Sequence, residues 1–231
     1  MTVEEIIGRY MEKVPEVHEL CSRCLATERW GGSVVLMVVD AAFTSIGLNY
    51  FQTVVPKVME FREEFVEKNR VHTLGDLSRE PTEELQRVWK NRRSWAVAKE
   101  VAAYLAGLVD GGMDERAALR HWARGVELRR WTRDPIGKIR GVGINTLQYL
   151  RMMGGVDTVM PDKIVKRVIN GILEEAGEPR VEKDLEFIRA VHDLASRTGY
   201  RAIELCWMTW LIQSEGEISK TEKYAEVLRY I

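Results

Sequence analysis

The sequence has too few cysteines for a disulfide framework. It contains three in 231 residues, an odd number, and Cys21 and Cys24 are too few ligands for an iron–sulfur cluster. No run of about eighteen apolar residues occurs, which excludes an ordinary transmembrane helix. The first residues are acidic where a signal peptide is basic. We therefore expect a soluble, cytoplasmic protein.

The sequence also lacks a grouped set of metal ligands. His18, Cys21 and Cys24 follow one another at three-residue steps and imitate half of a metal site, but the four histidines are scattered. The His-x-Glu and Pro-Cys-x-x-Cys signature of zinc deaminases is missing as well. Buried helical thiols explain the pattern better, so we expect no metal and no cofactor.

Helical patterning runs through the whole chain. Apolar residues make up 45% of the sequence and recur at helical spacing in 34–43, 97–108 and 164–173, whereas no alternating strand pattern competes. Glycine-containing breaks separate these segments. The sequence predicts an all-α fold of about ten helices.

The most informative segment surrounds two glycines. Asp134 and Pro135 predict a short helix, Gly141-Val142-Gly143 predicts a tight turn, and a second helix should leave that turn with unpaired backbone amides. Such amides suit a phosphate group. The alternative is a plain helix C-cap followed by a turn.

About twenty residues later, Pro161 and Asp162 predict the start of another helix. A carboxylate in this position is favoured in its ionised form by the helix dipole. A phosphate-binding turn and a carboxylate held in a fixed position together suggest chemistry on a nucleic acid. The alternative is an aspartate that only complements the dipole.

The order and spacing of these residues resemble the helix-hairpin-helix DNA glycosylase superfamily, which contains endonuclease III and the alkyladenine glycosylases. In that family a hydrophobic-x-Gly-Val/Ile-Gly hairpin precedes an essential aspartate, and 139–143 and Asp162 fill those places. Pro161-Asp162 is most similar to the alkyladenine branch. The segments 74–85 and 91–99 look like the paired helices that precede the hairpin. The resemblance covers roughly residues 33–175.

The resemblance implies two helical lobes with a cleft between them. The central lobe would span 31–156 and contain the helix-hairpin-helix motif at 134–153. The second lobe would combine 1–30 with 157–231 and carry Asp162.

The resemblance also implies site residues. Asp162 would be the catalytic group, because a carboxylate stabilises an oxocarbenium-like sugar or orients the attacking water. Asn145 occupies the position of the lysine that bifunctional members use as a nucleophile, so the reaction should be monofunctional. The alternative roles for Asn145 are a hydrogen bond to the base or sugar and a cap on the second helix. The expected contacts to the DNA backbone are Gly141, Val142, Gly143, Thr146, Lys138 and Arg140.

Positive charge is concentrated before the hairpin. Eight arginines and lysines lie between Arg116 and Arg140 against two acidic residues, although the whole chain has a formal net charge of −1. Trp122 and Trp131 in this stretch are candidates for a base pocket or a DNA surface, with core packing as the alternative.

The leading hypothesis is a monomeric DNA N-glycosylase that acts on double-stranded DNA with a modified or mispaired base. A glutamine that fills the gap left by the flipped base is missing from 40–50, where Ile46 or Leu48 could be a wedge. A non-catalytic helix-hairpin-helix DNA-binding protein and a helical interaction protein are the alternatives.

Overall fold

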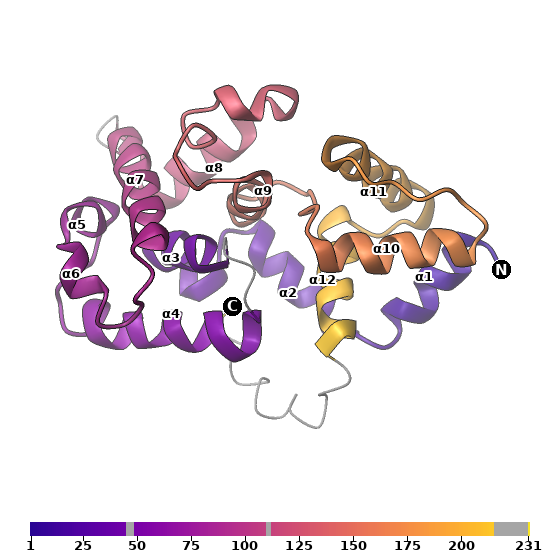
Figure 1. Ribbon diagram of the computed structural model, residues 1–231, viewed down its shortest axis with the longest axis horizontal. Coiled ribbons are helices and arrows are strands. Elements are labelled where there is room, and N and C mark those ends of the chain that lie inside the picture. The colour runs from indigo at the N-terminus through magenta and orange to yellow at the C-terminus, as the bar shows by residue number, and fades with distance from the viewer. Residues whose placement is uncertain (45–48, 110–111, 215–230) are drawn as a thin grey trace.

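The computed structural model describes residues 1–44, 49–109, 112–214 and 231, and these are helical with no strand among them (Figure 1). The all-α prediction is therefore confirmed. The α-helices are α1 (Val3–Met11), α2 (Val17–Leu25), α3 (Val34–Thr44), α4 (Val55–Phe61), α5 (Leu74–Arg79), α6 (Thr82–Leu85), α7 (Arg92–Val109), α8 (Glu115–Gly125), α9 (Ile144–Met153), α10 (Lys163–Glu175), α11 (Asp184–Thr198) and α12 (Ala202–Ser214). Shorter helical turns are η1 (Arg29–Gly32), η2 (Tyr50–Val54), η3 (Arg62–Val66) and η4 (Leu128–Arg133).

Polar residues set several helix boundaries. The Thr2 and Thr73 side chains begin α1 and α5 with reciprocal capping boxes, and Asp114 caps α8. Gly199 ends α11 in the left-handed conformation, with φ of 76°. These local signals explain why the helices begin and end where they do.

Helix α3 is the centre of the core on one side of the molecule. All its residues from Val34 to Phe43 are buried, and it packs against α4, α7 and α9. On the other side, α1 packs against α10, α11 and α12, while α2 packs against α12 and α9 (Figure 1). Helix α1 near the start of the chain and helices α10–α12 late in the chain therefore form one packed group. The lobe boundaries and the cleft stay predictions.

A buried ion pair lies within this core. Asp40 on α3 accepts hydrogen bonds from Arg29 (3.2 Å), the Trp30 indole (2.9 Å) and the hydroxyls of Tyr50 (3.0 Å) and Tyr149 (2.9 Å). Both charged side chains are fully buried, and such charges are tolerated only when they are paired. Because Tyr149 lies on α9, its hydrogen bond to Asp40 holds α9 against α3.

No helix in the described part of the chain is long and apolar enough to cross a membrane.

Candidate functional site

The segment before Gly141 forms turns in place of the predicted short helix. The Asp134 carboxylate accepts the amides of Ile136 (2.9 Å) and Gly137 (3.2 Å), and the Trp122 indole donates to it (3.0 Å). The backbone approaches η4 closely here, since a Cβ at Gly137 would lie 1.9 Å from the Trp131 carbonyl oxygen. One α-helical hydrogen bond forms here, from the Lys138 amide to the Asp134 carbonyl (2.9 Å), but the Ile139 and Val142 amides bond to carbonyls three residues back, so the segment does not continue as a regular helix. The predicted first helix is therefore wrong, whereas the second is present as α9.

The two glycines of the turn differ in what the fold requires. Gly141 has φ of 109°, and a Cβ there would lie 2.9 Å from Val97 Cγ2 and 3.1 Å from Arg93 Nε. The fold therefore requires glycine at 141. Gly143 has an ordinary φ of −104°, and a Cβ there would meet nothing within 4 Å. The protein's own packing does not explain glycine at 143.

Gly143 is also the N-cap of α9, a position that usually carries a capping side chain. Among the described residues, none accepts a hydrogen bond from the amides of Gly143, Ile144 or Asn145. These donors carry the positive end of the helix dipole. The N-terminus of α9 is therefore suited to a small anion.

Basic side chains surround this turn. Lys138 and Arg140 are exposed, as is Arg93, which contacts the turn from the first turn of α7. Sequence reasoning missed Arg93, because it lies far from the hairpin in the chain and only the packing of α7 brings it there.

Part of the predicted basic stretch has a structural role. Arg116 donates to the carbonyl of Ala26 (2.9 Å), and Arg120 donates to Leu25 (3.1 Å) and Thr27 (3.0 Å). Both arginines thereby attach α8 to the end of α2. The remaining exposed cations that have no ion-pair partner among the described residues are Arg124, Arg129, Arg133, Lys138 and Arg140.

Asp162 is the N-cap of α10. Its Oδ1 accepts the amides of Ile164 and Val165, both at 2.8 Å, and its Oδ2 accepts the indole N–H of Trp210 at 2.9 Å. Burial raises the pKa of the Asp162 carboxyl above its usual value, and the three hydrogen bonds offset part of that rise. The sequence predicted Asp162 in the first turn of this helix; the structure places it one residue earlier, as the N-cap, with an indole contact that the sequence did not suggest.

No cation neutralises this carboxylate within the described residues. Asp162 makes no salt bridge there, and Lys163 beside it is exposed. The described part of the chain also has no three His, Cys, Asp or Glu side chains grouped to hold a metal ion. Asp162 is thus a half-buried anion held only by neutral donors.

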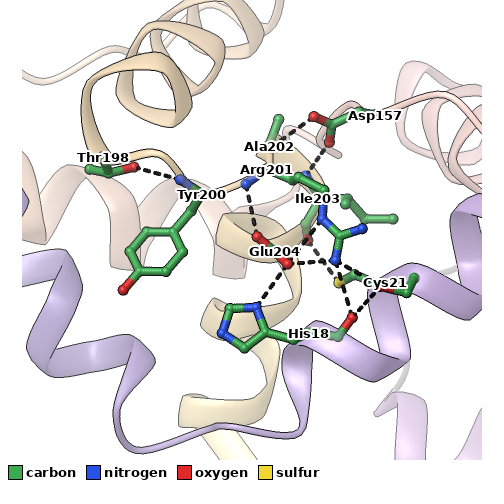
Figure 2. Close-up of polar contacts among 10 residues, drawn as sticks. His18, Cys21, Asp157, Thr198, Tyr200, Arg201, Ala202, Ile203 and Glu204 are labelled. Carbon is green, nitrogen blue, oxygen red and sulfur yellow. Dashed lines mark hydrogen bonds and ion pairs between the residues drawn. The ribbon is translucent and has the colours of Figure 1, made fainter.

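The segment that carries Asp162 is attached to α12 at a second point. The Asp157 carboxylate accepts the amides of Ala202 (3.3 Å) and Ile203 (2.9 Å) at the start of α12 (Figure 2). One residue before α12, Arg201 donates to Glu204, which also lies 2.9 Å from His18 of α2. Helix α12 is therefore fixed against both α2 and the loop that leads to Asp162.

The other predicted residues are distributed unevenly. Thr146 and Trp122 are buried, Trp131 is half-buried, and Asn145 is exposed in the first turn of α9. Trp122 supports the turn through Asp134. The wedge candidates Ile46 and Leu48 lie outside the described residues.

No hydrogen bond or ion pair among the described residues joins Asp162 to the glycine turn. Aromatic side chains connect α9, which follows the turn, to Asp162. The Tyr149 hydroxyl on α9 donates to the Tyr50 hydroxyl (3.1 Å), and the centroids of the Tyr50 and Trp210 rings are 5.4 Å apart. The indole of Trp210 then donates to Asp162.

Comparison with known proteins finds no match among curated proteins and none among solved structures. Residues 9–214 match the model of a family described as a domain of unknown function, DUF8548. Because the match covers most of the sequence, the chain belongs to the DUF8548 family.

Proposed function

We propose that the protein is a monofunctional DNA N-glycosylase of base excision repair. It binds double-stranded DNA, flips a modified or mispaired base out of the stack, and hydrolyses the bond between that base and its sugar. The observation that carries the proposal is the environment of Asp162, a carboxylate in a partly desolvated position that makes no salt bridge among the described residues.

Such a carboxylate suits the reaction. As the base leaves, the sugar becomes oxocarbenium-like, and a fixed negative charge near that carbon stabilises it. Neutral donors on Asp162 hold the charge in place without cancelling it. A cationic partner would cancel much of the effect.

The glycine turn supports binding to the DNA backbone. Open amides at the start of α9 suit a phosphate oxygen, and the space beside Gly143 allows the phosphate to approach. Lys138, Arg140 and Arg93 add attraction without reading sequence.

Asn145 supports a reaction without a covalent enzyme intermediate. An asparagine amide cannot form a Schiff base with the sugar, so water completes the cleavage and the DNA backbone remains intact.

The second candidate is a DNA-binding protein without catalysis. The observation that favours it is the capping role of Asp162, since a helix N-cap explains an aspartate here without any reaction.

One experiment separates these functions. The protein is incubated with duplexes that carry uracil, hypoxanthine, 8-oxoguanine or alkylated purines, and free base and strand integrity are measured. We expect free base from at least one duplex and an intact strand until the abasic site is cleaved chemically. Salt-sensitive binding with no base released from any duplex favours the non-catalytic protein. The absence of salt-sensitive binding contradicts both functions.

The glycine turn has its own test in Gly143→Asp. An aspartate at this N-cap takes up the open amides of α9 and adds a negative charge where a phosphate would bind. We expect DNA affinity to fall at least about ten-fold, the effect of losing a hydrogen bond to a charged group, while the melting temperature stays the same or rises slightly. Fluorescence anisotropy and thermal unfolding measure the two quantities.

Gly171→Asp is the matched control, because it adds the same charge at an exposed position in α10 where a Cβ also meets nothing. Its affinity should change by less than about three-fold at physiological salt, where distant charges are screened. Equal losses in the two variants would mean that the turn is not the phosphate contact.

A further inference from the structure

We propose that Trp210 is a positioning residue for Asp162, and that its indole N–H leaves Oδ2 as the oxygen that faces the reacting sugar. This inference rests on the proposed function. It comes from a contact between α12 and the start of α10, two elements that the sequence gives no reason to connect.

The two oxygens of Asp162 have different surroundings. Oδ1 accepts two amide N–H groups of α10, which fill its two acceptor positions. Oδ2 accepts only the Trp210 indole among the described residues and so retains one acceptor position. The oxygen with remaining capacity is the one that Trp210 orients.

The indole is itself held firmly. Trp210 is 9% exposed, and its ring lies 5.5 Å from that of Trp207 and 5.4 Å from that of Tyr50. Trp207 in turn stacks on the buried guanidinium of Arg29 at 4.9 Å. These contacts restrict rotation of the indole, so its N–H is directed at Oδ2 before any substrate arrives.

The position of α12 is fixed as well. Asp157, from the same loop as Asp162, caps the start of α12, and the Arg201, Glu204 and His18 contacts join it to α2 (Figure 2). The loop therefore holds the N-terminus of α12 through Asp157, while Trp210, more than two turns along α12, holds Asp162. Such support by groups around a reactive side chain sets its orientation.

The hydrogen bond also has an electrostatic consequence. A donor to the ionised carboxylate favours that form, whereas burial opposes it. Loss of the indole N–H should therefore raise the pKa of Asp162 and leave Oδ2 free to turn.

The test compares Trp210→Phe with Trp89→Phe. Both tryptophans are buried, but the Trp89 ring packs against Phe43, away from Trp210, and its indole nitrogen has no hydrogen-bond partner among the described residues. A third protein carries 3-benzothienyl-alanine at position 210, which retains the ring size of tryptophan and lacks the N–H. It keeps the test valid if Trp210→Phe unfolds.

The first readout is the titration of the Asp162 carboxyl, followed by carbon-13 NMR in the protein without DNA. We expect its pKa to rise by about one pH unit in both position-210 proteins, as loss of a hydrogen bond to a charged group predicts, and to stay within a few tenths in Trp89→Phe. The second readout is base release from a duplex that the wild type processes. We expect kcat to fall roughly ten-fold with KM unchanged, and the acid limb of the pH profile to move upward by the same interval.

An unchanged Asp162 pKa in the position-210 proteins overturns the proposal, whatever their activity. A raised pKa with an unmoved pH profile overturns it too, because the contact would then have no bearing on the reaction. Failure of the proposed function is seen separately, as the absence of base release by the wild type.

Discussion

Asp162→Asn should release free base at least about a hundred-fold more slowly than the wild type while unfolding at nearly the same temperature. Removal of one preorganised electrostatic group costs roughly 3–4 kcal/mol in a transition state that develops charge. Asparagine is nearly isosteric with aspartate and still caps α10, so the helix should remain intact. Single-turnover base release and thermal unfolding measure the two effects.

The difference in stability between Asp162→Asn and the wild type should depend on pH. Burial raises the pKa of Asp162 in the folded protein above its usual value of 3.8. The contribution of Asp162 to the free energy of unfolding is fully present below the pKa that it has in the unfolded chain. This contribution is lost as the pH rises through its pKa in the folded protein. Ionised Asp162 therefore disfavours the folded state at neutral pH, and any stability advantage of the asparagine variant should shrink as the pH falls toward 3.8.

Asp114→Asn is the matched control, since Asp114 is also an N-cap aspartate and lies exposed at the start of α8. It should retain full base release. If Asp162→Asn retained activity as Asp114→Asn does, Asp162 would be a helix cap and nothing more.

Asp40→Ala should lower the free energy of unfolding by roughly 3–5 kcal/mol, the cost of leaving a buried charge unpaired. The substitution removes the acceptor of the hydrogen bonds from Arg29, Trp30, Tyr50 and Tyr149. It leaves unpaired the Arg29 guanidinium, which is fully buried and already has two nitrogens without a hydrogen-bond partner among the described residues. Urea denaturation followed by circular dichroism measures the loss.

Two further variants bracket this result. Glu175→Ala breaks an exposed pair with Arg9 and should cost at most about 1 kcal/mol. The double variant Asp40→Leu with Arg29→Met replaces both charges with apolar side chains and should recover much of the stability lost in Asp40→Ala. A loss below about 1 kcal/mol in Asp40→Ala would show that the buried pair does not hold η1, α3 and α9 together.

The parts of this fold that depend on local patterning could be predicted from the sequence. Helical periodicity predicted the all-α class, and Pro161 with Asp162 predicted the start of α10, where the structure has an aspartate N-cap. In each case the interactions that determine the local structure are between residues close together in the sequence.

The missed features depend on contacts between distant segments. The orientation of the Trp210 indole toward Asp162 depends on the attachment of α12 to Asp157 and α2. Arg93 reaches the glycine turn only through the packing of α7. The buried Asp40 had one visible signal, an aspartate within the otherwise apolar segment 34–43, but four of its donors come from three other elements.

The predicted helix at 134–140 failed for a similar reason. Asp134 and Pro135 are good helix starters, yet the Asp134 carboxylate caps a turn that Trp122 also holds, and Gly137 lies against the backbone of η4. Local preference for a helix was overridden by packing against η4 and α8.

The most direct measurement of the central claim does not require knowledge of the excised base. A duplex carrying a cationic pyrrolidine in place of one sugar imitates the charge of the transition state, and its affinity is compared with that of an undamaged duplex. We predict binding at least about a hundred-fold tighter by the wild type, as transition-state analogues show, and loss of that preference in Asp162→Asn. Equal affinity of the wild type for both duplexes, or a preference that survives in Asp162→Asn, would contradict the assignment of Asp162 as the group that stabilises the sugar cation.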